Sequence, residues 1–294
     1  MQATTKKTLG WLSVCLGLFL FCRGRDDQQQ DHIVIAASIA PLADLCKQVG
    51  GDRVTVFTLV PPGANPHTFE LTPEQMRRLA DTRLLVLNGI GLEYWADKVI
   101  DNFQTSALQV VWASEGIPVL QDEDHAAGNP HVWLNPLFAK IQMEKIAAAL
   151  IQLDSPHASV YATQRDRFGR QLLDLDREIT AQVASWQNIS FICFHPSWNY
   201  FAERYGLVQA AVIEKRPGFE PTPKETMEII ETAKRLHTKA IFAEQQFPMK
   251  TSELIARECD ARVLVLDPLG SYTANYSYLA LLRANVEQMA LALK

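Results

Sequence analysis

The sequence predicts an α/β protein made of two lobes, each a mainly parallel sheet flanked by helices, joined by one long backbone helix. Three observations support this class. Short runs of branched apolar residues alternate with helix-like runs in both halves of the chain, as in parallel sheets. One stretch between the halves, residues 155–187, keeps helical spacing without any strand signal. Hydrophobic residues make up 48% of the 294 residues, which is enough to form a core.

The first residues have the pattern of an export signal. Lys6 and Lys7 precede an apolar run that is shorter than the roughly 20 residues of a membrane span. We therefore assign residues 1–22 to an export signal and residues 23–31 to a polar tether, with Cys22 as a candidate for lipidation. This assignment places the protein in the periplasm, or on the outer face of the membrane if Cys22 is lipidated.

The N-terminal lobe is assigned to residues 32–154. Strands are expected where apolar and β-branched residues cluster between turn signals, and helices where apolar residues recur at helical spacing. The expected strands are Ile33–Ala37, Val54–Leu59, Leu84–Leu87 and a weaker Leu108–Ala113. The expected helices are Ser38–Val49, with Ser38 as its cap and Gly50-Gly51 at its end, Pro73–Ala80 and Asn135–Leu153.

The linking helix is assigned to residues 155–187. Apolar residues recur there at helical spacing, among them Phe168, Leu172 and Ile179, with charges between them. About 30 residues at 1.5 Å each give a helix of roughly 45 Å. The apolar spacing is not a sustained heptad, which argues against a coiled-coil arm and favours a strut between two lobes.

The C-terminal lobe, residues 188–294, resumes the alternation, and no sequence repeat relates it to the first lobe. Thr222, Pro223 and Glu225 form a capping box with proline at the first helical position. The expected strands are Ile189–Phe194, Val208–Ile213, Ala240–Ala243 and Val263–Leu266. The expected helices are Trp198–Tyr205, Thr222–Leu236, Thr251–Cys259 and Asn275–Leu293.

Charge and cysteine content narrow the class of partner. The net charge is −5, and it becomes −7 when Lys6 and Lys7 leave with the signal, which argues against a nucleic-acid surface and is compatible with attracting cations. Cys46, Cys193 and Cys259 match no zinc-finger or CxxC spacing. In an exported protein Cys193 and Cys259 are the pair to check for a disulfide, and buried free thiols are the alternative.

Two stiff loops each present one histidine. His67 lies in Val60–Pro73, where three prolines and a glycine within six residues prevent a helix or a central strand from continuing. His131 lies in Asn129–Pro136, which also contains flanking prolines. A stiff loop suits a metal ligand because it holds the ligand geometry before the metal arrives. The alternatives are that His67 is simply solvated and that His131 packs beside Trp133.

Three more polar residues, His195, Glu244 and Asp267, follow expected strands of the second lobe. Ligands of parallel α/β sheets gather at the carboxyl ends of the strands, so we expect an inter-lobe cleft with converging nitrogen and oxygen donors. His195 could instead cap the next turn, Asp267 could be an ordinary turn residue, and Glu244 could be a solvated or outer-shell carboxylate. The remaining histidines are expected at the surface: His32, His157, His237 and His125, the last in the acidic run Asp122–His125.

Three neutral imidazoles and a carboxylate suit a four-coordinate transition ion. Calcium and magnesium prefer shells made only of oxygen and therefore fit poorly. Zn²⁺ is favoured over Mn²⁺ because imidazole suits zinc and because Mn²⁺ is the weaker binder at a given site, although Mn²⁺ remains an alternative cargo.

Several motifs together resemble the zinc or manganese substrate-binding proteins of bacterial ABC importers. They occur in order, and the resemblance extends from Ile33 almost to the C-terminus. The motifs are Asn65-Pro66-His67, Asn129-Pro130-His131-Val132-Trp133-Leu134-Asn135-Pro136, Phe194-His195-Pro196-Ser197-Trp198-Asn199-Tyr200, Gly218-Phe219-Glu220-Pro221-Thr222-Pro223 and Asp267-Pro268-Leu269-Gly270.

The resemblance implies that His67, His131, His195 and Asp267 hold the metal and that a membrane permease receives it. Manganese-type members commonly have a glutamate as the third ligand, so His195 points to zinc. The chain departs from many zinc-type members because it lacks a long His-rich loop and has only Asp122–His125 there. We expect a monomer without catalytic activity, whose only contacts with the membrane are the permease and a lipid anchor at Cys22.

Two other functions fit parts of the pattern. A zinc hydrolase would use three histidines, an open fourth position, and Glu244 or Asp267 as general base, although no HExxH motif is present. A surface adhesin would use the metal as a structural element, so chelation would unfold it. A transport protein is expected to remain folded without metal and to close by small movements of its lobes.

Overall fold

The computed structural model describes residues 2, 32–103, 107–121, 127–215, 218–270 and 277–294. The chain divides into two units, Met1–Asp31 and His32–Lys294, and the second contains the helices and sheets. The assignments of residues 1–22, of residues 23–31 and of Cys22 therefore lie outside the described residues, as do those of Asp122–His125. Within the described ranges, none of the helices combines the length and apolar character needed to cross a membrane.

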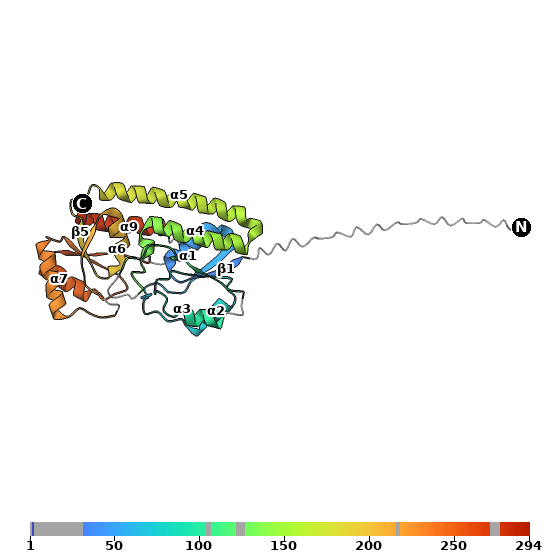
Figure 1. Ribbon diagram of the computed structural model, residues 1–294, viewed down its shortest axis with the longest axis horizontal. Coiled ribbons are helices and arrows are strands. Elements are labelled where there is room, and N and C mark those ends of the chain that lie inside the picture. Colours follow the sequence, from blue (N-terminus) through green and yellow to red (C-terminus); the bar gives the residue numbers. More distant parts are fainter. Residues whose placement is uncertain (1, 3–31, 104–106, 122–126, 216–217, 271–276) are drawn as a thin grey trace. The chain divides into compact units, whose positions relative to one another are not determined.

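The N-terminal lobe contains a parallel sheet with strand order β2-β1-β3-β4. Its central strand β3 is buried along its whole length, as expected for a sheet covered on both faces. Figure 1 shows α2 and α3 on one side of this sheet, and α1 and α4 on the other. The strands are β1 (Ile33–Ala37), β2 (Val54–Thr58), β3 (Leu84–Leu87) and β4 (Gln109–Trp112). The helices are α1 (Ala40–Gly50), α2 (Pro73–Ala80), α3 (Ala96–Asn102) and α4 (Pro136–Leu153), with short 3-10 turns η1 (Gly51–Arg53) and η2 (Val132–Leu134).

The C-terminal lobe repeats the same arrangement with the strand order β6-β5-β7-β8, again entirely parallel. The β5–β6 register shifts by one residue between Phe191 and Ile192. The strands are β5 (Ser190–Cys193), β6 (Val208–Val212), β7 (Ala240–Ala243) and β8 (Arg262–Val265). The helices are α6 (Asn199–Tyr205), α7 (Pro223–Arg235), α8 (Lys250–Glu258) and α9 (Tyr278–Leu293), with the 3-10 turn η4 (Pro196–Trp198).

The long helix α5 (Ala158–Val183) runs along α4 and reaches α9 and α6 of the second lobe (Figure 1). It is shorter than the expected 155–187, because Ser155–His157 forms the 3-10 turn η3 ahead of it. Asp176 attaches it to the C-terminal lobe by accepting hydrogen bonds from the Arg204 guanidinium at 2.8 and 2.6 Å and from the Tyr205 hydroxyl at 3.1 Å.

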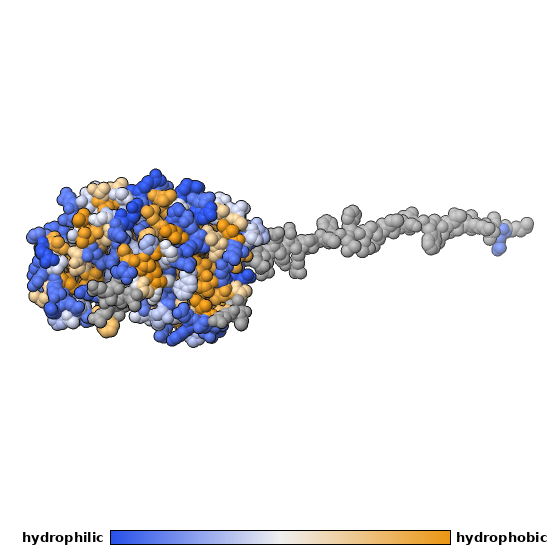
Figure 2. Space-filling view, in the orientation of Figure 1, coloured by the Kyte–Doolittle hydropathy of each residue, from blue (hydrophilic) through white to orange (hydrophobic). Residues whose placement is uncertain are grey.

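A continuous hydrophobic core joins the lobes. It contains Ile35 of β1, Leu172 of α5, Phe242 of β7 and Val286 of α9, all buried. Because this core includes residues of both sheets and of the long helix, the lobes share packing besides the α5 connection. On the outside, Figure 2 shows hydrophilic residues spread over the whole visible face, with separate hydrophobic patches between them.

One expectation was wrong, and it has a physical reason. Ser38 does not cap α1: its N–H and C=O pair with Val86 and Val60 and so extend the sheet, and the cap position falls on Ile39. Of the two alternatives left open for Cys193 and Cys259, the structure has free thiols, with Sγ atoms directed at the backbone oxygens of His195 and Ile230, respectively. The sequence also gave no signal for α3, which lacks a side-chain cap.

Candidate metal centre

The first histidine loop leaves β2 and is fastened to the sheet before it reaches His67. The N–H groups of Leu59 and Val60 donate to the carbonyls of Ala37 and Ser38 at 2.8 and 2.9 Å. Beyond the buried Pro66, the His67 N–H donates to Asn65 Oδ1 at 2.9 Å. This short loop, closed by a side chain, directs the half-buried His67 imidazole inward.

The second histidine loop lies between β4 and η2 and is more deeply buried. Asn129 is completely buried and His131 is 2% exposed. Asn129 Oδ1 accepts the His131 N–H at 3.0 Å and lies 2.9 Å from His131 Nδ1. Asn88, at the end of β3, donates from Nδ2 to the Pro130 carbonyl at 2.9 Å. The loop is thus held by two buried amide side chains.

His195 follows β5 directly and is 1% exposed. The preceding residue, Phe194, still belongs to the sheet: its N–H donates to Phe242 at 2.8 Å and its C=O accepts from Glu214 at 2.7 Å. His195 itself is extended, with φ −123° and ψ 150°, which is the conformation favoured before a proline such as Pro196. The strand end and the proline therefore fix the direction of this imidazole.

The three imidazoles converge on one point between the lobes. His67 Nε2 lies 3.2 Å from His131 Nε2 and 3.2 Å from His195 Nε2. Two nitrogen ligands of a tetrahedral zinc ion, each 2.0–2.1 Å from the metal, are about 3.3 Å apart. Among the described residues these three form the one group of three or more His, Cys, Asp or Glu with ligand atoms close enough to share an ion.

The cavity beside these nitrogen atoms is small. Its volume is about 10 Å³, roughly the space of one water-sized sphere. It is lined by the three histidines, by the rings of Trp133 and Phe247, and by Glu244. His131 packs against Trp133, with ring centroids 5.2 Å apart, so the packing role and the ligand role expected for it coexist. Such a space accepts a single ion.

Glu244 follows β7 and is buried beside the site, 1% exposed. Its two carboxyl oxygens accept hydrogen bonds from Ser197 Oγ at 2.8 Å and from Gln246 Nε2 at 2.6 Å. Burial raises the pKa of Glu244 to about 8, the Ser197 hydrogen bond opposes the rise, and the charges of Asp267 and Glu214 add to it. The carboxyl is therefore an outer neighbour of the site, as one of the sequence alternatives proposed.

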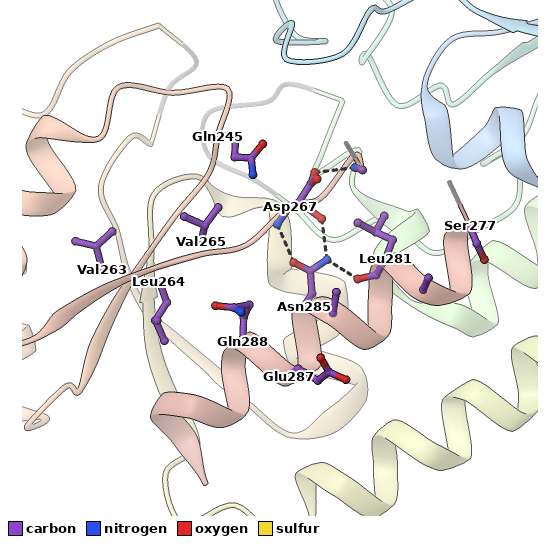
Figure 3. A pocket seen from close by; sticks show the side chains of 13 residues that line it. Gln245, Val263, Leu264, Val265, Asp267, Ser277, Leu281, Asn285, Glu287 and Gln288 are labelled. Atoms are coloured by element: carbon purple, nitrogen blue, oxygen red, sulfur yellow. Dashed lines mark hydrogen bonds between the residues drawn. The ribbon is translucent and has the colours of Figure 1, made fainter. Parts of the chain in front are cut away.

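Asp267 follows β8, two residues beyond its end, and is held in a turn. Its Oδ1 accepts the N–H groups of Leu269 and Gly270 at 3.0 and 2.7 Å, and its backbone pairs with the Asn285 side chain of α9 (Figure 3). Its carboxylate is not a member of the three-histidine group. Its charge nevertheless acts on Glu244, so it lies near the site.

The three other histidines in the described ranges lie elsewhere. His32 and His237 are exposed, and His157 is partly exposed and bonded to Asp154 through Nδ1 at 2.8 Å. Sequence reasoning gave no role to Asn129 or Asn88. The signal available for Asn129 was its position two residues before a histidine, which is repeated at Asn65.

The fold has two parallel α/β lobes of equal strand order, spanned by a long helix. The lobes meet at three imidazoles around a space for one ion. These features are those of a metal-binding protein of the two-lobed substrate-binding class. Comparison with known families identifies the group. Residues 35–292 match the family described as zinc-uptake complex component A, periplasmic (ZnuA). The chain belongs to this family.

Individual relatives agree with the family assignment. The high-affinity zinc uptake system protein ZnuA of Bacillus subtilis is 26% identical over 276 residues, which cover 88% of this chain and 86% of that protein. A crystal structure of ZnuA superposes with a TM-score of 0.83 at 35% identity and covers 89% of this chain and 99% of its own. The laminin-binding protein Lmb of Streptococcus agalactiae, described as bifunctional with adhesin and metal transporting activity, gives a TM-score of 0.82 at 29% identity, covering 90% of this chain and 100% of its own.

Proposed function

We propose that the protein captures Zn²⁺ outside the cytoplasm and delivers it to the membrane permease of an ABC importer. The observation that carries this proposal is the pair of 3.2 Å distances between Nε2 atoms around His67. Three imidazoles favour Zn²⁺ over ions that prefer oxygen, and Mn²⁺ remains the second candidate cargo. The relatives named as zinc-uptake proteins support the same cargo.

We assign His67, His131 and His195 as the nitrogen ligands and Asp267 as the fourth donor. The assignment of Asp267 rests on its position after β8, on its neighbours Pro268 and Leu269, which line the cavity, and on the resemblance carried by the motif Asp267-Pro268-Leu269-Gly270. A carboxylate as fourth donor would complete a closed tetrahedral shell, as capture requires, and would leave no open position for a reacting water.

Two features favour binding over hydrolysis. The cavity of about 10 Å³ beside the three imidazoles suits a single ion better than an organic substrate. Glu244 is the candidate general base nearest the histidines, and both of its carboxyl oxygens already accept hydrogen bonds, from Ser197 and Gln246. We therefore assign no catalytic activity to this site.

The continuous core favours a protein that stays folded without metal. Residues from both sheets and from α5 pack together over a core that extends far beyond the histidines. Removal of the ion would leave that packing intact, which argues against a purely structural metal. We place the protein as a monomer in the periplasm, or on the outer face of the membrane through Cys22.

Elemental analysis by mass spectrometry tests this proposal. The wild type, purified without added metal, is expected to contain about one zinc per chain, and His195→Ala much less. His237→Ala removes an exposed histidine and should retain the zinc of the wild type. Manganese or iron in place of zinc would contradict the assignment of zinc as cargo. If the wild type held no metal after incubation with zinc and desalting, the proposed metal site would be wrong.

A further inference from the structure

One buried amide connects two of the three histidine loops. Asn129 Oδ1 contacts both the backbone N–H and the ring Nδ1 of His131, at 3.0 and 2.9 Å. Its Nδ2 donates to the carbonyl of Pro196 at 2.7 Å, across the boundary between the lobes. Pro196 directly follows His195. A single side chain thus bonds to a ligand from one lobe and to the residue beside a ligand from the other.

The partners of Asn129 fix the orientation of its amide group. The Pro196 carbonyl can only accept a hydrogen bond, so the nitrogen of the amide must face it. The His131 backbone N–H can only donate, so the amide oxygen must face that loop. The assignment of oxygen and nitrogen, often ambiguous for asparagine, is therefore determined by two backbone groups.

This orientation determines the tautomer of His131. Because Nδ1 faces an oxygen that can only accept, Nδ1 carries the proton. The lone pair then resides on Nε2, the atom that lies 3.2 Å from His67 Nε2. The ring is thus prepared to bind a metal through Nε2.

We propose that Asn129 is a positioning residue that selects the metal-binding tautomer of His131 and holds this ligand in place against the His195 loop. The inference rests on the metal-capture function proposed above. The backbone of Asn129 is itself fastened, since the Tyr200 hydroxyl donates to its carbonyl at 2.8 Å. Both partners of the amide are therefore positioned by the fold before any ion arrives, which reduces the reorganisation that binding requires.

The first Asn-Pro-His motif provides an internal contrast. Asn65 also accepts the N–H of the histidine two residues later, at 2.9 Å. In the described part of the chain, however, its side chain makes no hydrogen bond to the C-terminal lobe, and it is only partly buried. The Asn-Pro-His motif therefore explains the local turn in both loops. Of the two asparagines, both within the described ranges, only Asn129 contacts a histidine ring nitrogen and links the lobes.

The test combines two variants with one control. Asn129→Leu removes both functions of the amide at similar volume. Asn129→Asp keeps an oxygen toward His131 but loses the donor to Pro196. Asn65→Leu is the matched control in the first motif. Nitrogen-15 NMR of the metal-free proteins reports the His131 tautomer, and competition with a zinc chelator reports the zinc affinity.

In the wild type and in Asn129→Asp, His131 is expected to carry its proton on Nδ1, whereas Asn129→Leu should show a tautomer mixture. Zinc affinity should fall by about 10- to 100-fold in Asn129→Leu, the usual loss for an outer-shell partner, and Asn129→Asp should recover most of it. Asn65→Leu should stay within about threefold of the wild type. If Asn129→Leu does not fold, Asn129→Asp still tests the bond to Pro196 through its affinity deficit, and a His131 proton on Nε2 in this variant would overturn tautomer selection.

An unchanged tautomer in Asn129→Leu, or an affinity within threefold of the wild type, would overturn tautomer selection. Equal affinity of Asn129→Asp and the wild type would overturn the role of the bond to Pro196. Failure of the wild type to bind zinc would instead contradict the proposed function. The tautomer measurement on metal-free protein would still decide the role of Asn129.

Discussion

The two lobes have sheets of the same strand order but place different side chains near the site. Both have four parallel strands in equivalent order, and their sequences show no repeat. The N-terminal lobe supplies two imidazoles, His67 and His131, from long loops. The C-terminal lobe supplies one imidazole, His195, and two carboxyl groups, Glu244 and Asp267, within two residues of strand ends. The common fold therefore determines where ligands can lie, and the loops determine which types of side chain lie there.

Proline is used in opposite ways in the two lobes. In the N-terminal lobe it precedes each histidine, as Pro66 and Pro130, and the asparagine before it closes the turn. In the C-terminal lobe it follows the polar residue, as in Pro196 after His195, and restricts that residue to an extended conformation. Both arrangements stiffen a ligand, so both lobes should contribute to metal affinity without prior ordering of a loop.

The largest expected effect is the loss of one imidazole from either lobe. His67→Ala and His195→Ala should each weaken zinc binding by more than the roughly 10- to 100-fold typical of an outer-shell partner. Competition titration of both variants with a zinc chelator measures this. A severe loss of zinc affinity in one variant with near-normal binding in the other would contradict a site shared by both lobes. The site would then belong to a single lobe.

The second effect concerns Glu244, the carboxyl group that the C-terminal lobe places beside the site. The pKa of Glu244 is about 8 in the folded protein and near 4.5 when exposed, so the folded state holds a proton that the unfolded state releases over this range. The stability of the metal-free wild type should therefore fall as the pH rises from 4.5 to 8.

Glu244→Gln should remove this part of the pH dependence. Between pH 5.5 and 8 the difference in unfolding free energy between wild type and variant should change by about 3 kcal/mol, at 1.36 kcal/mol per pH unit. Urea unfolding at several pH values measures it. Parallel curves for the two proteins would show that Glu244 is ionised in the folded state.

A smaller effect is expected at Asp267. Asp267→Asn keeps an oxygen for the N–H groups of Leu269 and Gly270 but removes the charge. Zinc affinity should fall by about tenfold while the three imidazoles still hold the ion. Glu287→Gln is the control, because it removes an exposed charge of α9 that lines the same surface pocket as Asp267 (Figure 3). Equal affinities for Asp267→Asn and the wild type would exclude Asp267 as a donor.

The smallest effect tests whether equivalent helices of the two lobes are capped equally. Thr72 opens α2 and Thr222 opens α7, each with a complete capping box to Gln75 or Glu225. Thr72→Ala and Thr222→Ala should each lower the unfolding free energy by about 1 kcal/mol, and the corresponding Thr→Ser variants much less. A loss in only one of the two Thr→Ala variants, measured by urea unfolding, would show that the two helices are not capped equally.

The fold was largely predictable because its signals are local. The capping box of Thr222 and Glu225 predicted α7, and the apolar spacing of Phe168 and Leu172 predicted the long helix. The expectation for Ser38 was wrong because its backbone extends the sheet, which depends on partners in β3 and in the segment after β2. The equal strand order of the lobes was invisible in the sequence because strand order is a property of tertiary pairing.

The site was predictable to the extent that it follows from strand ends. His67 and His195 were expected just beyond strands and His131 in a stiff loop before a helix, and the structure brings the three together. The bond from Asn129 to Pro196 could not be foreseen, because it joins residues of different lobes that only the folded chain makes neighbours. The turn that holds Asp267 depends likewise on a helix, α9, at the end of the chain.

The most direct test of the account is X-ray absorption at the zinc edge of the zinc-loaded protein. We predict a first shell of nitrogen and oxygen at 2.0–2.1 Å with the scattering of three imidazoles, reduced to two in His195→Ala. A sulfur neighbour near 2.3 Å, or fewer than three imidazoles in the wild type, would contradict the three-histidine site.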